Sequence, residues 1–238
     1  SFLTFGYVPG ELCILEGVKK LPPASALIFD LNKNSLKVFE YWQLPISNNY
    51  EAKSINLNLL YEEFDVLFKD SVKKQLVSDV PIGILLSGGI DSSLIAYYAA
   101  NLSKNVKTFN VSFKKFGDFD ESRHARLVAK FLGTDHIEID IDEPSPDLMF
   151  KLSKQFDEPI ADSSIIPTFL LSQEVKKYCT VALGGDGGDE LFGGYKHYDR
   201  LLWLEKYLSK LPNNIKKLIS TNITEKLPIG FKGKNWLQ

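Results

Sequence analysis

The sequence predicts an α/β fold in which a parallel sheet is covered by helices on both faces. From about residue 59 onward, short apolar segments of strand type alternate with longer segments of helical periodicity. That alternation is typical of parallel strands joined by crossover helices. The chain has 238 residues, of which 44% are hydrophobic, and this is enough to bury a real core.

The first part of the chain, residues 1–45, has a different pattern. A β-like run occupies residues 5–11, and a turn at 32–34 between two apolar runs predicts a β-hairpin. A hairpin alone is too small to form a core, so this segment is interpreted as the tail of a domain whose remainder is absent. The polar stretch at 46–58 is predicted to be a linker.

The elements of the main part follow from hydrophobic periodicity, and Gly133 stands where a helix C-cap is expected. The expected order is a helix from 59, a strand at 82–86, a helix from 92, a strand at 106–113, a helix at 121–132, a strand at 136–141, helices at 147–156 and 168–178, a strand ending at 183, and a helix from 197.

A loop of glycines and serines joins the strand at 82–86 to the helix from 92. The loop therefore lies at a helix N-terminus, where free backbone N–H groups and the helix dipole favour an anion. Gly88 and Gly89 have no Cβ, so the backbone can take a positive φ and approach a ligand closely. The hydroxyls available to donate to phosphate oxygens belong to Ser87, Ser92 and Ser93.

Asp91 is the carboxylate of this loop and can only accept hydrogen bonds. Beside a polyphosphate it requires a divalent cation between the two anions, and Mg²⁺ is the expected ion. A common helix N-cap after a glycine turn is the simpler alternative. The complete strand, loop and helix context favours nucleotide phosphates, although the GxxxxGK[ST] loop is not the pattern present.

A second Gly-rich loop, residues 184–195, follows the strand-like run at 180–183. Six of its twelve residues are glycine, and ordering so many glycines costs conformational entropy that an ordinary connection need not spend. Asp186, Asp189 and Glu190 add carboxylates that suit a metal site. A flexible acidic surface loop is the alternative. Because loops at the carboxyl ends of strands line the ligand crevice of such sheets, we expect this loop to form a second wall of one site.

Composition narrows the class of function. A net charge of −2 argues against a general nucleic-acid or anionic-membrane binder. The sequence contains neither an apolar run of membrane-spanning length nor a signal-peptide pattern at residue 1. Two cysteines, Cys13 and Cys179, in a chain of this size give no disulfide framework, so a reducing, cytoplasmic setting is expected. The three histidines lack zinc-ligand spacing, which argues against a structural zinc.

Two segments in combination, residues 80–93 (VPIGILLSGGIDSS) and 185–195 (GDGGDELFGGY), resemble the glutamine-hydrolysing asparagine synthetases. The first loop alone is shared with the wider N-type ATP pyrophosphatases, whereas the second is far more specific. Further similar segments are FGYVP at 5–9, KLPP at 20–23, DES at 120–122, LGTDH at 132–136 and DEPIAD at 157–162.

The resemblance implies a domain assignment. Residues 1–45 correspond to the C-terminal remnant of a glutamine amidotransferase domain, and residues 59–238 to a truncated synthetase domain with an adenine nucleotide alpha hydrolase-like sheet. The family's glutaminase domain begins with a catalytic cysteine, and Ser1 is not that residue. We therefore expect no glutamine hydrolysis by this chain.

The resemblance also implies the chemistry: aspartate attacks the α-phosphate of ATP to give β-aspartyl-AMP and pyrophosphate, and ammonia, taken from glutamine in the full-length enzyme, displaces AMP. A homodimer is compatible with it. By motif, Asp91 and Asp189 share Mg²⁺, and Asp91 and Asp186 are the catalytic candidates; Asp186 stands where many family members carry Glu. The implied pyrophosphate contacts are Ser87, Gly88, Gly89, Asp91, Ser92 and Ser93, and the adenosine contacts are Leu85, Val111, Gly184 and Gly185.

Three alternatives stay open at the level of sequence. A related amidotransferase or a β-lactam synthetase would act on another carboxylate. A nucleotide-binding fragment would bind ATP without turnover. A purely structural interaction fragment would show no Mg²⁺-dependent ATP binding.

Overall fold

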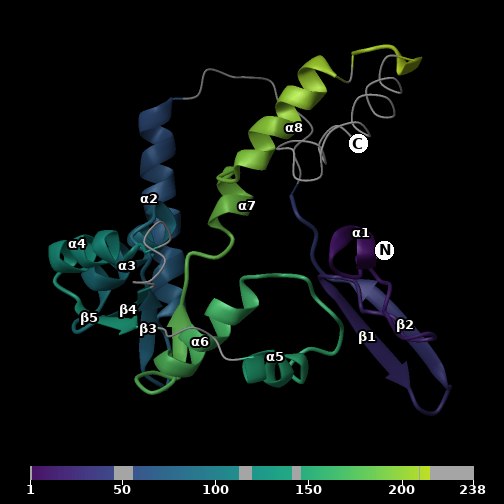
Figure 1. The fold of residues 1–238 in the computed structure, drawn as a ribbon, viewed down its shortest axis with the longest axis horizontal. Helices are drawn as coiled ribbons and strands as arrows, with labels where there is room; N and C mark the ends of the chain where they lie inside the picture. Colours follow the sequence, from purple (N-terminus) through teal and green to yellow (C-terminus); the bar gives the residue numbers. More distant parts are fainter. Residues whose placement is uncertain (1, 46–55, 113–119, 141–145, 209, 215–238) are drawn as a thin grey trace. The chain divides into compact units, whose positions relative to one another are not determined.

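The computed structural model describes residues 2–45, 56–112, 120–140, 146–208 and 210–214 (Figure 1). The chain divides into two compact units, Ser1–Gly184 and Gly185–Gln238. The first unit contains both sheets, and the second contains two helices among its described residues, α7 (Gly188–Phe192) and α8 (Lys196–Tyr207).

Among the described residues, the central sheet has four strands, and every pair of neighbouring strands is parallel, as the sequence predicts. Its strands are β3 (Ile82–Leu85), β4 (Lys107–Ser112), β5 (Asp135–Asp140) and β6 (Val181–Leu183). They lie in the order β5, β4, β3, β6, so β3 and β4 are the inner strands. The carboxyl ends of all four strands therefore share one edge.

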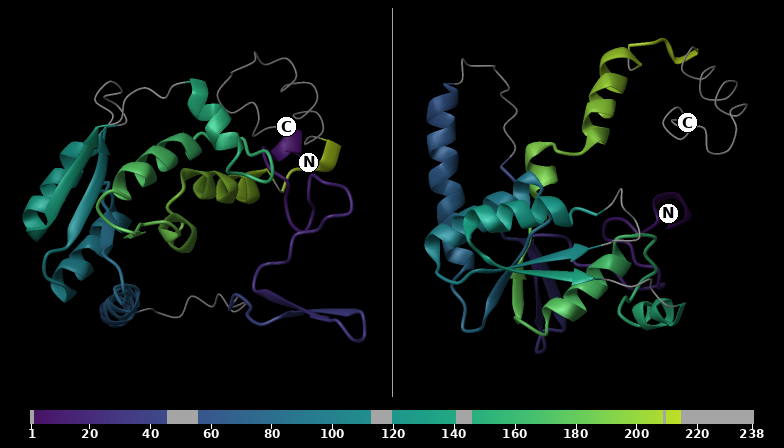
Figure 2. Two further views of the ribbon diagram at one scale, coloured as in Figure 1. Left: turned by 90° about the horizontal axis from the view of Figure 1, so that it is seen from below. Right: turned by 60° about the vertical axis from the view of Figure 1, so that its left-hand side comes forward.

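Helices cover both faces of this sheet (Figure 2), which confirms the predicted fold class. On one face, Ile84 and Leu86 pack in a core with residues of α2 (Leu57–Gln75), α3 (Ile90–Leu102) and α4 (Ser122–Leu132). On the other face, the buried ring of Phe109 packs with Val175 near the end of α6 (Ile165–Val175) and with Cys179. Burial raises the pKa of the Cys179 thiol, in keeping with a core residue.

Element boundaries differ from the predictions by a few residues in most cases. α5 (Pro146–Ser153) and α6 each begin before their predicted start, and each ends three residues early. Gly133 has a φ of 67° at the end of α4, which confirms the predicted left-handed C-cap. The predicted ends of two strands, at 113 and 141, lie outside the described residues.

The N-terminal hairpin is confirmed, because β1 (Ser25–Asp30) and β2 (Ser35–Glu40) pair antiparallel. The β-like run expected at 5–11 is wrong. Phe5 ends the short helix α1 (Phe2–Phe5), and Gly6 and Gly10 follow with φ values of 78° and 64°. Two left-handed residues within five positions prevent an extended strand.

The predicted linker needs a smaller correction. Residues 46–55 lie outside the described part, but Leu57 and Asn58 belong to α2 rather than to a linker. The helix begins there because the Asn56 side chain accepts hydrogen bonds from the backbone N–H groups of Asn58 and Leu59. That arrangement is an N-cap, which a polar run in sequence can conceal.

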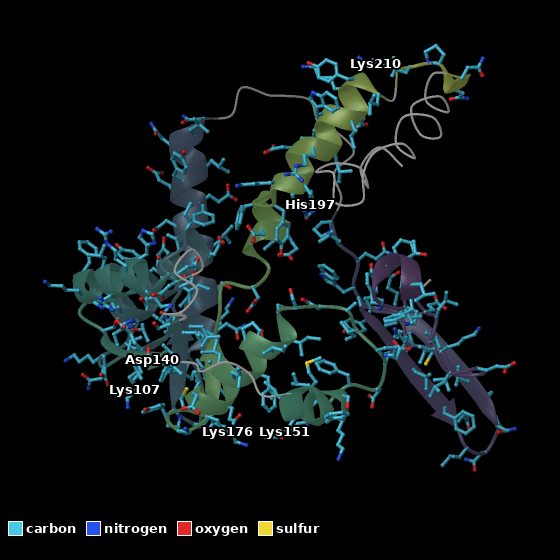
Figure 3. The ribbon with its side chains drawn as sticks, in the orientation of Figure 1. Lys107, Asp140, Lys151, Lys176, His197 and Lys210 are labelled. Atoms are coloured by element: carbon cyan, nitrogen blue, oxygen red, sulfur yellow. The ribbon has the colours of Figure 1, made fainter. Side chains whose placement is uncertain are left out.

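Among the described residues, lysines are spread over separate elements (Figure 3). Lys107 begins β4, Lys151 lies in α5 and Lys176 follows α6. Lys177 pairs with Glu174 one turn before it, at 2.6 Å. These lysines belong to separate solvent-facing surfaces and do not form one basic surface.

The segment before the hairpin is attached to the loop between α5 and α6 through Glu158. Lys20 Nζ lies 2.5 Å from one Glu158 carboxylate oxygen, and the other accepts the Ile14 backbone N–H at 2.8 Å. The Ala161 N–H donates to the Gly6 carbonyl at 2.8 Å. The Lys20 ammonium, the Ile14 N–H and the Cys13 thiol together hold the pKa of Glu158 at about 2.

We expect this carboxylate to make stability depend on acid. Because its pKa in the folded protein lies below the usual 4.5, the stabilisation is complete above pH 4.5 and is lost as the pH falls toward 2. The free energy of unfolding of wild type should exceed that of Glu158→Gln at pH 6, and the difference should shrink below pH 4.5 in urea titrations. A difference that stays constant with pH would contradict the assignment; Lys20→Met is the matched control that should reproduce the loss at pH 6.

Candidate functional site

The loop after β3 leads directly into α3. The helix begins at Ile90, two residues before its predicted start, so Asp91, Ser92 and Ser93 occupy its first turn. Gly89 is the N-cap residue, in an extended conformation, and it has no side chain to satisfy the first N–H groups. These groups and the helix dipole remain available to an anion.

Two serine hydroxyls hold the loop in shape. The Ser87 backbone N–H donates to Ser92 Oγ at 3.2 Å, and the two hydroxyl oxygens lie 3.0 Å apart. Ser92 Oγ donates to the Gly89 carbonyl at 3.3 Å. Ser93 Oγ is buried and has no hydrogen-bond partner among the described residues. A ligand oxygen at the start of the helix would suit that unused hydroxyl.

Gly88 allows a close approach between the loop and α4. Its φ is 87°, and a Cβ placed on it would lie 2.6 Å from the Ala125 nitrogen and 2.6 Å from His124 Cβ. Both the left-handed conformation and the lack of space explain why glycine occupies this position. Gly88 takes the positive φ that the absence of a Cβ permits, whereas the φ of Gly89 is −68°.

The predicted adenosine contacts in the first unit lie together at the carboxyl edge of the sheet. The ladder between β3 and β4 ends with Leu85 opposite Phe109, so Val111 extends beyond the end of β3. On the other side of β3, Ile84 pairs with the last residue of β6, and Gly184 follows immediately. Leu85, Val111 and Gly184 therefore flank the same end of β3 at which the serine loop begins.

The second unit begins at Gly185, and the predicted loop at 184–195 is partly wrong because it contains α7. Gly187, with a φ of 90°, begins this helix, and Gly193, with a φ of 67°, ends it. Glycines that suggest a loop in sequence here act as the two caps of one short helix. Asp186 precedes the helix, and Asp189 lies in its first turn.

The neighbouring Glu190 is held by an aromatic hydroxyl. Tyr195 Oη donates to Glu190 Oε1 at 2.8 Å, and this hydrogen bond to a carboxylate raises the pKa of Tyr195 to about 12. Asp189 is tied to the turn that follows, since its carbonyl accepts the Gly194 N–H at 3.0 Å. Within the second unit, the two predicted acidic residues thus lie close together in sequence, with Asp186 just before the N-cap of α7 and Asp189 in its first turn.

Asp91, in the first turn of α3, and Asp189, in the first turn of α7, each carry a carboxylate, and carboxylate oxygens are hard ligands of the kind that Mg²⁺ prefers. Among the described residues, no three His, Cys, Asp or Glu side chains gather into a ready-made metal cluster.

Sequence reasoning missed one residue that supports the loop. Asn110, in the buried strand β4, donates from Nδ2 to the carbonyl of Leu86, the residue before the loop, at 3.0 Å. In the sequence, the only sign of this role is an amide side chain inside an otherwise strand-like run.

None of the described helices is both long and apolar enough to cross a membrane.

Comparison with known proteins places these features in a family. Residues 63–236 match the model of the asparagine synthase family. Over its whole length the chain is 34% identical to asparagine synthetase [glutamine-hydrolyzing] 1 of Bacillus subtilis, and it covers 37% of that protein. It is also 29% identical, over 82% of its length, to an amidase of Gibberella zeae, and it covers 33% of that protein. An NH3-dependent NAD synthetase from Campylobacter jejuni, solved with a nitrate ion, matches with a TM-score of 0.38 and 20% identity, covering 57% of this chain and 60% of that one.

The family match covers both glycine-rich segments as well as the whole central sheet. The chain spans little more than a third of the length of the Bacillus subtilis relative. Within that span, the parallel sheet, the serine loop at the start of α3 and the acidic segment around α7 are the parts described above. This chain belongs to the asparagine synthase family.

Proposed function

We propose that this chain is the synthetase part of an enzyme that makes asparagine from aspartate, ATP and ammonia. In the first step the aspartate side-chain carboxylate attacks the α-phosphorus, the bond from that phosphorus to the bridging oxygen breaks, and pyrophosphate leaves. In the second, ammonia attacks the acyl carbon, AMP leaves, and a proton is lost from nitrogen. The observation that carries this proposal is the loop between β3 and α3, whose glycine N-cap leaves the first-turn N–H groups open to phosphate.

The residues divide by the part of ATP that they would hold. The adenosine would lie at the end of β3 between Leu85, Val111 and Gly184, with Gly185 next along the chain. Val111 supports this role because its backbone extends past the last residue of β3, where an adenine edge can meet it. The pyrophosphate group would be held by the loop and first helical turn, namely Ser87, Gly88, Gly89, Asp91, Ser92 and Ser93.

Two carboxylates would bind Mg²⁺, Asp91 from α3 and Asp189 from α7. Magnesium, when bound, neutralises charge on the pyrophosphate leaving group. Without a cation, Asp91 would repel the phosphates that the loop otherwise attracts. Its place in the first turn of α3 therefore supports a metal-dependent site rather than a simple anion site.

Asp186 would act in the amidation step. A carboxylate beside the attacking ammonia can accept the proton that nitrogen loses, provided that it comes within hydrogen-bond reach in the complex. The ammonia would come from glutamine, in keeping with the name of the Bacillus subtilis relative. Two free cysteines, Cys13 and Cys179, support a reducing compartment such as the cytoplasm.

A second candidate function is adenylation of a different carboxylate. The similarity to an amidase of Gibberella zeae favours it, because that relative matches over 82% of this chain under another name. The two candidates share the nucleotide site and differ in the acceptor. They are separated by which carboxylic acid supports exchange between ATP and pyrophosphate.

The direct test is exchange of labelled pyrophosphate into ATP with Mg²⁺ and aspartate. We expect wild type to exchange and Asp91→Ala to lose exchange by at least about 100-fold, because the leaving group is no longer neutralised. Exchange by Asp91→Ala at the wild-type rate would contradict the metal assignment. Exchange that requires another acid would favour the second candidate, and Mg²⁺-dependent ATP binding by wild type without exchange would favour a binding fragment.

A further inference from the structure

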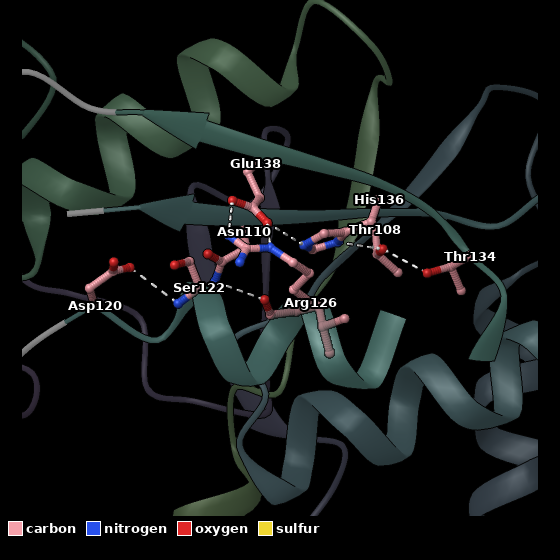
Figure 4. A network of polar contacts seen from close by, with 9 residues as sticks. Thr108, Asn110, Asp120, Ser122, Arg126, Thr134, His136 and Glu138 are labelled. Carbon is pink, nitrogen blue, oxygen red and sulfur yellow. Dashed lines mark hydrogen bonds and ion pairs between the residues drawn. The ribbon is translucent and has the colours of Figure 1, made fainter. Parts of the chain in front are cut away.

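Asn110 is a polar side chain in the middle of the central sheet, on the face covered by α4 (Figure 4). It is 5% exposed, and the Leu86 carbonyl that accepts its Nδ2–H belongs to a residue that is 1% exposed. Its other amide atom, Oδ1, is buried and has no hydrogen-bond partner among the described residues. The side chain thus makes one buried hydrogen bond and leaves one buried acceptor unsatisfied.

The bonded carbonyl belongs to the peptide that enters the phosphate loop. A peptide unit is planar, so the Leu86 C=O and the Ser87 N–H are fixed in opposite directions on one rigid plate. The carbonyl end is held by Asn110, and the N–H end donates to Ser92 Oγ at 3.2 Å. Ser92 Oγ in turn donates to the Gly89 carbonyl. The planar peptide group between Leu86 and Ser87 therefore links the Asn110 amide to Ser92, and through Ser92 to Gly89.

The hydrogen bond from Asn110 to Leu86 lies at the end of the ladder between β3 and β4. The ladder between β3 and β4 ends at Leu85 and Phe109, with one more backbone bond from the Leu86 N–H to the Phe109 carbonyl at 2.8 Å. The Asn110 amide supplies the next link between the two strands. It sets how the chain leaves the sheet where the serine loop begins.

Stability alone does not account for an amide at this site. An unsatisfied buried acceptor is costly, and an apolar side chain of similar size would remove that cost. The same substitution would release the Leu86 carbonyl, so the two effects on stability oppose each other. An apolar residue cannot, however, hold the Leu86–Ser87 peptide group in a fixed orientation.

We infer that Asn110 is a positioning residue for the phosphate groups of the nucleotide, acting through the Leu86–Ser87 peptide on the loop that begins α3. This inference rests on the proposed function, because it assumes that the loop binds phosphate. It concerns the orientation of the loop and not the adenosine end of the site. Loss of the amide should therefore weaken phosphate binding selectively.

The matched pair of variants is Asn110→Leu and Thr108→Val. Thr108 lies two residues earlier on the same strand and the same face, is fully buried, and bonds through Oγ1 to Thr134 Oγ1 and His136 Nδ1, each at 2.9 Å (Figure 4). Both substitutions remove buried hydrogen bonds and keep the number and branching of the side-chain heavy atoms, but only the first touches the loop.

Binding of MgATP, magnesium pyrophosphate and adenosine is measured by calorimetry on the 238-residue chain, alongside thermal melting. For Asn110→Leu we expect Kd for MgATP and magnesium pyrophosphate to rise about tenfold, Kd for adenosine to stay unchanged, and the melting temperature to move by less than about 4 °C. Thr108→Val should lower the melting temperature and leave all three Kd values within about twofold.

Equal phosphate affinity in wild type and Asn110→Leu would overturn the inference. So would a parallel loss of phosphate and adenosine affinity together with a large fall in melting temperature, which is the signature of a purely structural role. If wild type binds neither MgATP nor magnesium pyrophosphate, the proposed nucleotide site itself fails and this inference fails with it.

Discussion

Gly88→Ala should abolish MgATP binding and destabilise the first unit. At a φ of 87°, an alanine costs roughly 1 kcal/mol relative to glycine. The added Cβ would also lie 2.6 Å from the Ala125 backbone nitrogen, and a helix backbone cannot move aside as a flexible side chain can. We therefore expect the free energy of unfolding to fall by about 3 kcal/mol or more, and MgATP affinity to fall at least about 100-fold because the loop must leave α4.

Gly89→Ala is the matched control for this prediction. Gly89 has an ordinary φ of −68°, and the nearest atom to an added Cβ is the Ser87 hydroxyl oxygen at 3.3 Å. An N-cap glycine gives up about 1 kcal/mol or less when replaced by alanine. Urea unfolding would separate the stabilities of the two variants, and calorimetric titration with MgATP would compare Gly88→Ala with wild type. Wild-type affinity in Gly88→Ala would show that the loop does not pack on α4 when nucleotide is bound.

The parts of the fold that the sequence predicts well are those fixed by local rules. The central strand β3 carries a continuous apolar run, and Gly133 ends α4 as a left-handed cap. The run at 5–11 looked extended because its side chains suit strands, whereas Gly6 and Gly10 take left-handed conformations there. Apolar composition does not reveal a backbone conformation that only glycine readily adopts.

The candidate site shows the same division. The predicted glycines and serines of the loop are where the sequence places them, since strand, loop and helix follow each other directly along the chain. The partners of the loop are different, because Asn110 and the first turn of α4 reach it only through the order of strands in the sheet. Those contacts join residues more than twenty positions apart, and neither periodicity nor a short motif encodes them.

Gly83 depends on a contact of this long-range kind. It lies in β3 as a buried residue, and a Cβ added there would collide with the ring of Phe109 and lie 2.8 Å from Cys179 Sγ. The ring has little freedom to move, because Phe109 is 1% exposed and packs against Tyr178 with ring centroids 5.6 Å apart. In the sequence this glycine only interrupts an apolar run, whereas in the sheet its missing side chain leaves the space that the Phe109 ring occupies.

Gly83→Ala should therefore lower the free energy of unfolding by about 2 to 3 kcal/mol, as overpacking of a close-packed core does. Phe109→Leu alone should also destabilise, because it removes ring volume from the core. The double variant should lose less than the sum of the two, with a coupling of about 1 kcal/mol or more measured by urea unfolding. When Gly83→Ala is combined with Cys179→Ala instead of Phe109→Leu, the coupling energy should be smaller, because the Phe109 ring still blocks the new methyl group. Strict additivity of Gly83→Ala and Phe109→Leu would mean that the strand shifts to admit the methyl group and that the ring does not set the spacing between β3 and its neighbours.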